Sequence, residues 1–458
     1  MDKSENIPSK FEKMTTYPVE KLVGQLAVPS ILIMMISAMY NMADTYFVGS
    51  LGTSATAAVG VSFSLMAVIQ AVGFFFGHGS GNYISRALGA QNTGDAERMA
   101  ATGFFSAFII GAVITVAGLL FINPLVRLLG ATDTILPYAL DYIQFILLAA
   151  PFMVCSLMLN NLLRFQGSAF FGMIGMTSGA VLNIALDPLF IFVFGLGIKG
   201  ASLATMLSQT ISCILLFTIT GAAKQNVHIL PRNFIPEIRL YKEIVRGGTP
   251  SLLRQGLMSL SAILLNHTAG GYGDAVIAAV SIVNRVVMLA SSALLGLGQG
   301  FQPVCGFNYG AKRYDRVKKA FWFCLRLSTV TLIILAVVCF IFAPDIIAQF
   351  RKDDPKVIAV GTLTLRLQCF VFPLAAWIIL NNMMLQTMGK GLAASVLAFS
   401  RQGLFLIPLL FILTPSLGIL GIQLCMPIAD VCTFILALPL GIRVLHKDLG
   451  GRPLIPTQ

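Results

Sequence analysis

Long apolar stretches, separated by short polar or glycine-rich turns, follow one another along almost the whole chain of 458 residues. Each stretch reaches the length of about 20 residues that an α-helix needs to cross a bilayer. A helix satisfies its own backbone groups inside a membrane, and the alternating pattern of membrane-barrel strands is not seen. Twelve transmembrane helices are therefore expected, at 22–48, 54–86, 98–122, 135–163, 169–194, 200–221, 244–268, 275–308, 316–342, 357–387, 392–413 and 418–444.

The two halves of the chain repeat each other at an offset of 221 residues. Each half would hold six helices, an even number, so both halves insert the same way up and are related by a pseudo-twofold axis along the membrane normal. The predicted fold class is all-α integral membrane, with two six-helix bundles. A site between rocking halves suits a transporter, and a duplication without a transport role is the alternative. The matched pairs include Pro29 and Pro250, Gly49 and Gly270, Gly77 and Gly298, and Gly197 and Gly418.

This pattern predicts a domain organisation of two lobes joined by a polar linker. The expected parts are an N-terminal segment at 1–21, an N-lobe at 22–221, a linker at 222–243, a C-lobe at 244–446 and a tail at 447–458. The polar N-terminal residues contain no short apolar run with a cleavage site, so no signal peptide is expected.

The distribution of charge fixes the expected orientation. Only 11% of the residues are charged, against about 25% in soluble domains. Of the 31 lysines and arginines, 21 fall on one side of the membrane if the helices alternate. They lie in and next to the termini and the linker, in the stretch 312–319, and at Arg86, Arg98, Arg164 and Lys390. The positive-inside rule then places both termini in the cytoplasm, in a bacterial plasma (inner) membrane. The net charge of +12 is thus a topological signal, and no nucleic-acid partner is expected.

The sequence contains no set of residues that predicts an enzyme. The eight cysteines sit mostly in apolar runs without a Cys-x-x-Cys pair, which favours buried hydrophobic side chains over metal ligands. The four histidines are scattered, and no phosphate-binding G-x-x-x-x-G-K-[ST] motif is present. No cofactor is expected beyond a coupling ion.

Three acids lie well inside apolar segments, where a charge is expensive and therefore a functional candidate. Asp44 and Asp187 lie about 8 and 12 Å from the outer ends of their helices. Asn183 is one turn before Asp187, and Thr205 lies at a similar depth. Asp430 is expected to form a salt bridge with an embedded arginine, Arg401 or Arg366, with a second ion site as the alternative.

Two functions are open for the oxygen cluster of Asp44, Asn183, Asp187 and Thr205. Its oxygens could bind Na⁺, a hard cation, or hold a proton, because burial and a neighbouring like charge both favour a protonated carboxyl group. A cationic substrate that competes with the ion would give antiport. Structural hydrogen bonding is the alternative.

Other residues of the N-terminal half are candidates for a substrate cavity. Met173 and Met176 continue the helical stripe of Asp187, and methionine adapts to varied ligands, although packing between helices is the more common role. Tyr40 is one turn from Asp44 and offers a ring to a cation. Asn160 and Asn161 either line the same cavity or bond between helices. Pro29 is a candidate bending point in the first helix, and a kink without a functional role is the alternative.

Several motifs resemble the multidrug and toxic compound extrusion (MATE) family, with the closest likeness to its MepA-like and DinF-like bacterial branch. They are NMADTYFVGSLG, SRALGAQNTGDAER, LRFQG, LNIALDPLF and GFNYGAKRYDR, and the resemblance covers essentially the whole chain. It implies export of cationic, lipophilic drugs in exchange for H⁺ or Na⁺.

The resemblance also implies roles for individual residues. Asp44, Asn183, Asp187 and Thr205 would form the ion site, Pro29 the bend of the first helix, and Tyr40, Asn160 and Met176 part of the cavity. The NorM-like branch carries acids in its seventh and tenth helices, which this sequence lacks inside 244–268 and after Asp354.

The function expected is an ion-coupled multidrug antiporter that works as a monomer among membrane lipids. The alternative is a flippase for a lipid-linked or other amphipathic precursor, because embedded arginines of the C-terminal half could bind a phosphate. A scaffold or sensor without transport is a third hypothesis. The arginines in question are Arg254, Arg285, Arg366 and Arg401.

Overall fold

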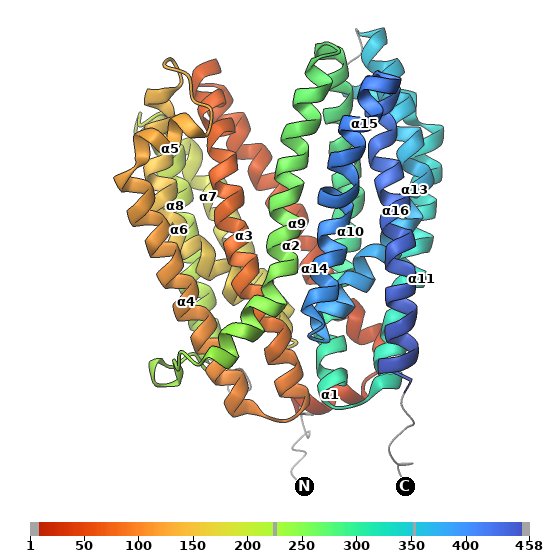
Figure 1. Cartoon of the computed structure of the whole chain (residues 1–458). Coiled ribbons are helices and arrows are strands. Elements are labelled where there is room, and N and C mark those ends of the chain that lie inside the picture. Colours follow the sequence, from red (N-terminus) through yellow and green to blue (C-terminus); the bar gives the residue numbers. More distant parts are fainter. Residues whose placement is uncertain (1–8, 223–226, 351–353, 451–458) are drawn as a thin grey trace, which may run out of the picture.

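A computed structural model describes residues 9–222, 227–350 and 354–450, and this part of the chain is built from helices without an assigned strand (Figure 1). The N-terminal half contains α1 (Lys10–Thr16), α2 (Val19–Gly49), α3 (Thr53–Gly89), α4 (Thr93–Leu120), α5 (Ile122–Leu128), α6 (Leu136–Phe165), α7 (Ala169–Pro188), the π-helix η1 (Leu189–Val193) and α8 (Ile198–Ala222). The C-terminal half contains the 3₁₀ turn η2 (Pro231–Asn233), α9 (Ile238–Gly270), α10 (Asp274–Gly310), α11 (Tyr314–Ile341), α12 (Ala343–Phe350), α13 (Pro355–Thr387), α14 (Gly391–Phe399), η3 (Ser400–Leu406), α15 (Ile407–Leu417), α16 (Ile419–Arg443) and η4 (Val444–Asp448).

The expectation of membrane-spanning helices is confirmed. Within the described residues, eleven helices are long and apolar enough to cross a membrane. The long helix outside this group is α9, which begins at Ile238, inside the stretch expected to be linker, and carries Arg254 and Gln255 near its middle. The short helices α1, α5 and α12 were not expected, because each is too short for a span.

The helices form two groups that lie side by side (Figure 1). One group contains α2 to α8 and is called the N-lobe; the other contains α9 to α16 and is called the C-lobe. Helix α2 contacts both, since it packs against α7 of the N-lobe and α10 of the C-lobe. Helix α1 and the last described residues of the chain lie at one end of the molecule, called here the terminal end (Figure 1).

The backbone repeats at the same offset as the sequence. Helices α3 and α10 each have 37 residues, and α4 and α11 each have 28. Left-handed residues recur 221 positions apart. These pairs are Gly52 and Gly273, Gln91 and Lys312, and Gly197 and Gly418. The two six-helix bundles expected from the sequence are therefore confirmed as a structural repeat.

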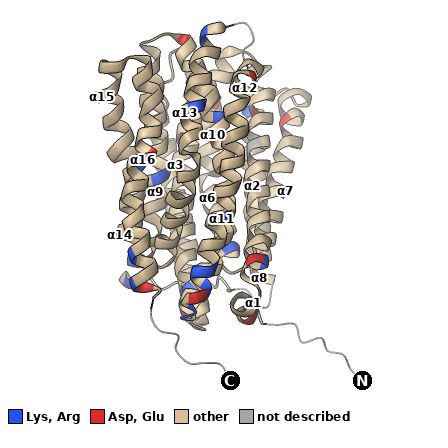
Figure 2. Cartoon of the chain, turned by 90° about the vertical axis from the view of Figure 1, so that its right-hand side faces the viewer, with Lys and Arg blue, Asp and Glu red and all other residues tan. Residues whose placement is uncertain are grey.

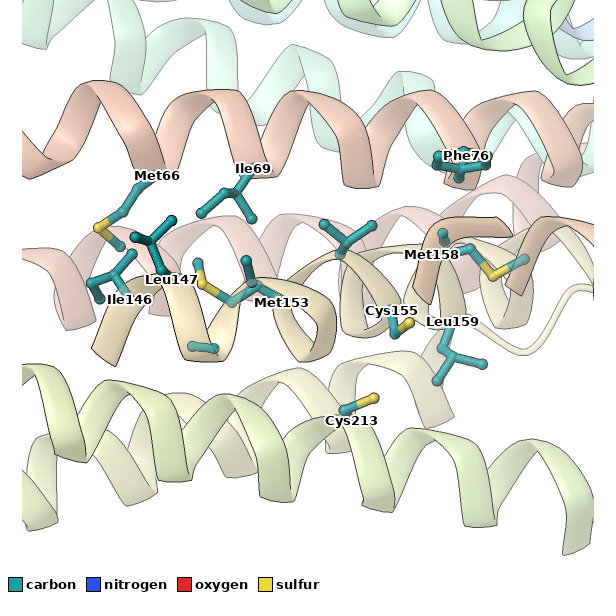
Figure 3. Close-up of a cluster of buried hydrophobic side chains, with 14 of the residues drawn as sticks. Met66, Ile69, Phe76, Ile146, Leu147, Met153, Cys155, Met158, Leu159 and Cys213 are labelled. Carbon is teal, nitrogen blue, oxygen red and sulfur yellow. The ribbon is translucent and has the colours of Figure 1, made fainter. Parts of the chain in front are cut away.

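The N-lobe has a continuous apolar core around α6 (Figure 3). Met66 and Ile69 of α3 face side chains of α6 such as Ile146 and Met153, and Cys213 of α8 lies near Cys155 on the other side (Figure 3). Within a bilayer such contacts stabilise the bundle through close van der Waals packing between the helices, because lipid tails are as apolar as these side chains. This packing holds α6 rigidly between α3, α4 and α8.

The two lobes are joined at the terminal end. Arg86 of α3 forms an ion pair of 2.7 Å with Glu243 of α9 and donates to the Thr387 carbonyl at 2.7 Å. Glycines bring the backbones together, because a β-carbon at Gly89 would stand 2.1 Å from the Phe307 carbonyl oxygen. Charged residues also gather mainly at this end (Figure 2).

Candidate functional site

The cluster of oxygen ligands expected in the N-lobe begins with Asn183 and Asp187 of α7. They are four residues apart, so they occupy one face of the helix, and both are buried. Thr205 of α8 completes this group. In the amide orientation that satisfies both neighbours, Asn183 donates to Asp187 Oδ2 at 3.2 Å and accepts from the Thr205 hydroxyl at 3.2 Å.

Asp44 of α2 faces this group from the neighbouring helix. Its side chain is buried, with 6% of its surface exposed, and lies close enough to Asp187 for the two carboxylates to repel each other. The Oδ1 atom of Asp44 has no hydrogen-bond partner. A buried carboxylate without a partner is costly, so an additional cation or proton would stabilise the pair.

Two tyrosines complete the cluster. The Tyr142 hydroxyl of α6 interacts with the Asp44 carboxyl group and with Thr205. Tyr40, one turn before Asp44, is also within electrostatic range of both carboxylates and interacts with Thr205. The sequence analysis named Tyr40 as a candidate but not Tyr142. The feature that could have identified Tyr142 is its position near the outer end of the fourth long apolar segment.

The end of α7 is shaped by Pro188. Proline cannot donate a backbone hydrogen bond, so it frees a carbonyl one turn earlier. The helix changes at this residue from α7 to the π-helix η1, a feature that is frequent at functional sites. Asp187 therefore lies at the point where the regular helix ends.

The remaining cavity candidates lie away from the carboxylates. Asn160 and Asn161 follow Tyr142 on α6 by about 27 Å along the helix axis. Asn160 faces α7, because a β-carbon at Gly172 would stand 2.6 Å from its Oδ1. Asn161 is buried and accepts a hydrogen bond from Arg164, so it bonds to a side chain one turn further along its own helix.

The methionines and the proline of the expected site take up different positions. Met173 and Met176 are half-buried, and Met176 packs against the N-lobe core. Pro29 is buried within α2, which continues as a helix on both sides of it. It precedes Asp44 by about 22 Å along the helix axis. The assignment of these residues to a cavity and a hinge stays a prediction.

The C-lobe has no equivalent oxygen cluster. The positions 221 residues after Asp44, Asn183, Asp187 and Thr205 hold Leu265, Leu404, Pro408 and Met426. The acid of this lobe, Asp430, is neutralised, because Arg401 Nε donates to it at 2.5 Å and Gln368 donates at 3.0 Å. The expected salt bridge with an embedded arginine is therefore confirmed for Arg401, whereas Arg366 lies over the ring of Phe340.

The donor set of the N-lobe cluster suits a small hard ion. It contains two carboxylates together with hydroxyl and amide oxygens. Within the described residues, no group of three or more His, Cys, Asp or Glu side chains is arranged to hold a metal. The cluster therefore offers oxygen ligands of the kind that Na⁺ accepts, or carboxyl groups that accept a proton.

Two repeated six-helix bundles, with a buried acid cluster in one of them, define a multi-pass membrane transporter rather than an enzyme. The family model named MatE matches residues 29–189 and 250–412, once in each half of the chain. The chain belongs to the MatE family, and the resemblance seen in the sequence is confirmed.

Named relatives and solved structures agree with this membership. The chain is 28% identical over 430 residues to the multidrug export protein MepA of Staphylococcus haemolyticus, covering 93% of each chain. It is 27% identical over 421 residues to MepA of Staphylococcus aureus, covering 92% of each.

Among solved structures, an outward-facing multidrug resistance MATE transporter matches with a TM-score of 0.89, at 26% identity over 96% of this chain and 99% of that one. A MOP superfamily transporter from Pyrococcus furiosus, described as having a binding pocket of reverse polarity, also matches with a TM-score of 0.89. Its identity is 26%, over 98% of this chain and all of that one.

Proposed function

We propose that the protein exports cationic, lipophilic compounds across a bacterial plasma membrane in exchange for H⁺ or Na⁺. It would work as a monomer surrounded by lipid, with the terminal end in the cytoplasm. The relatives named multidrug export proteins support the substrate class. The charge gathered at the terminal end supports the orientation, by the positive-inside rule (Figure 2).

One observation carries the coupling mechanism: Asp44 and Asp187 face each other in a buried site, and no Lys or Arg of the described residues forms an ion pair with either. A coupling ion or a cationic substrate would neutralise this pair. If only one of them can do so at a time, binding of the ion expels the substrate, which is antiport.

The arrangement of the lobes supports a direction for this exchange. The lobes are joined at the terminal end, which is cytoplasmic in this proposal, so the ion would enter from outside. Once loaded, Asp44 no longer repels Asp187, and α2 can repack against α7, with Pro29 as its bending point. Opening of the terminal end then releases the ion inward and admits the next substrate.

The alternative of a lipid-precursor flippase is not favoured. Its sequence argument was the set of embedded arginines in the C-terminal half. Of that set, Arg401 is neutralised by Asp430, and Arg366 lies over Phe340 instead of facing a cavity shared with the other arginines. The relatives named above are multidrug export proteins.

Ethidium efflux from proteoliposomes under separately imposed H⁺ and Na⁺ gradients tests the proposal. We expect one gradient to drive efflux by the wild type, and Asp44→Asn and Asp187→Asn each to reduce it at least tenfold. Such substitutions keep the shape of the side chain but remove the charge that the ion and the substrate would share. Asp141→Asn is the matched control, because Asp141 lies on α6 next to Tyr142 but pairs with Lys199 at the surface.

The outcomes separate the parts of the proposal. Efflux under one gradient alone identifies the coupling ion. Efflux by folded Asp44→Asn protein at the wild-type rate would remove the carboxylate pair from the mechanism. A wild type that moves no cation under either gradient would contradict the proposed function itself.

A further inference from the structure

A second charged cluster lies between the lobes and contains cations instead of acids. Arg164, near the end of α6, has only 3% of its surface exposed. Its guanidinium donates to Asn161 at 2.5 Å and to Gln302 of the C-lobe at 3.3 Å. Its Nε atom is buried and has no partner. All acceptors around this cation are therefore neutral, and one of its donors is unused.

His78 of α3 is a neutral member of this cluster. Its Nε2 lies 3.1 Å from Arg164 Nη2, and its Nδ1 lies 3.1 Å from the Ser251 hydroxyl of α9. Because a guanidinium can only donate, Nε2 must accept, and the ring proton is then on Nδ1, facing Ser251. The imidazole is thus a neutral bridge between the lobes, and Gln386 extends it by donating to Ser251 at 2.8 Å.

Arg254 brings a second positive charge from the opposite lobe. It lies on α9, one turn after Ser251, within electrostatic range of both Arg164 and His78. Within the described residues, neither Arg164 nor Arg254 forms an ion pair with an Asp or Glu. Arg164 is buried and Arg254 is half-buried, and two such cations within electrostatic range of each other without a counter-charge are costly. This contact between the lobes therefore lacks an anion.

We propose that Arg164 and Arg254 bind one small oxyanion, a phosphate or carboxylate group, at this contact between the lobes. Guanidinium groups bind such anions in bidentate geometry, and the unused Nε of Arg164 provides a donor for it. Because the two arginines belong to different lobes, the bound anion stabilises the conformation in which the terminal end is closed.

This site is distinct from the carboxylate cluster of the N-lobe. Arg164 and Tyr142 lie on the same helix, about 33 Å apart along its axis. The two sites also attract ligands of opposite charge. A substrate bound at Asp44 therefore does not supply the anion, and the inference does not depend on the proposed drug export.

The anion could come from a lipid headgroup or from a free ion, and one experiment distinguishes these sources. The thermal unfolding midpoint of the full-length protein in neutral detergent is measured with phosphate against chloride at matched ionic strength. It is also measured with short-chain phosphatidylglycerol against phosphatidylcholine. We expect an anion to raise the midpoint of the wild type by about 3 °C. Arg254→Gln should abolish this rise.

Two further variants keep the test conclusive. Arg366→Gln, which removes a half-buried arginine of the same lobe, should retain the full rise. If Arg254→Gln does not fold, Arg254→Lys keeps the charge, and equilibrium dialysis with radiolabelled phosphate then measures whether one ion binds per chain.

The pattern of results decides both the site and its ligand. A rise with phosphate identifies a free oxyanion as sufficient, and a rise with phosphatidylglycerol alone identifies a headgroup. The proposal is overturned if no anion changes the wild-type midpoint, or if Arg254→Gln responds as the wild type does.

Discussion

Buried carboxylates of the same type have different neighbours in the two lobes. Asp430 is held by Arg401 and Gln368, so its charge is compensated within the fold. Asp44 and Asp187 have each other and neutral groups as neighbours, so no cation of the described residues compensates their charge. Neighbouring cations, and not depth in the membrane, therefore distinguish Asp430 from the two acids proposed to bind the coupling ion.

The pair of Arg401 and Asp430 can be tested by removing one partner. Arg401→Gln leaves a buried carboxylate, whose exposed fraction is only 3%, without its cation, and we expect a loss of about 3 kcal/mol of stability. Removing both charges in Arg401→Met with Asp430→Leu should recover most of that loss. Thermal unfolding in detergent measures both. A double variant no more stable than Arg401→Gln would show that the pair has another role.

Local depth along the sequence was enough to predict which acids are buried. The positions of Asp44, Asp187 and Asp430 inside apolar segments identified them as exceptional, and the salt bridge expected for Asp430 is present. Tyr142 was missed because its role depends on α2 packing against α6 and α7, a contact between distant segments that periodicity does not reveal. Arg164 was counted among the cytoplasmic charges, although the structure buries it.

The lengths of the elements explain how Arg164 comes to be buried. Helices α3 and α10 each have 37 residues, far more than the roughly 20 that a bilayer requires. Helix α6 ends at Phe165, one residue after Arg164, while α3 continues for eleven residues beyond His78. The long helices therefore enclose a residue that segment boundaries alone place at the membrane surface.

Close packing of these long helices predicts the effect of one added methyl group. A β-carbon at Gly89 would stand 2.1 Å from the Phe307 carbonyl oxygen, and this clash between backbones is relieved only if α3 and α10 separate. We expect Gly89→Ala to increase the population that is open at the terminal end. Electron–electron distance measurements between spin labels at Thr93→Cys and Asp315→Cys would show a longer component.

The same helix supplies the control for this experiment. A β-carbon at Gly60 of α3 meets nothing within 4 Å, so Gly60→Ala should leave the distance distribution unchanged. Seven of the eight native cysteines are buried, which favours labelling of the introduced ones. An unchanged distribution in Gly89→Ala would mean that the two helices absorb the methyl group without separating.

At the scale of the whole molecule, the fold repeats but the charges do not. The 221-residue offset predicted the paired bundles, and the backbone follows it down to the left-handed Gly52 and Gly273. The chemistry is asymmetric: acids in the N-lobe, a neutralised pair in the C-lobe and two arginines between them. The relative placement of the lobes could not be predicted, because one sequence supports several placements, and the closed contacts decide which is seen.

The ion pair of Arg86 and Glu243 is one of the contacts that favour the closed placement of the lobes. It joins α3 to α9 at 2.7 Å and is mostly buried. Arg86→Glu would place two acids there and also remove the hydrogen bond to the Thr387 carbonyl. We expect the closed conformation to lose about 2 kcal/mol, roughly a thirtyfold change in the balance between the two conformations. The spin-label distances described above would shift toward the longer component.

Exchanging the two charges separates the ion pair from the rest of this contact. Arg86→Glu combined with Glu243→Arg restores the opposite charges but not the bond to Thr387, which requires a donor on α3. The exchanged protein should therefore recover only part of the closed population. Full recovery would assign the closure to the ion pair alone, and no recovery would assign it to the bond with Thr387. If the lobes stay closed in Arg86→Glu, the glycine contacts are sufficient to hold the terminal end closed without the ion pair or the hydrogen bond to Thr387.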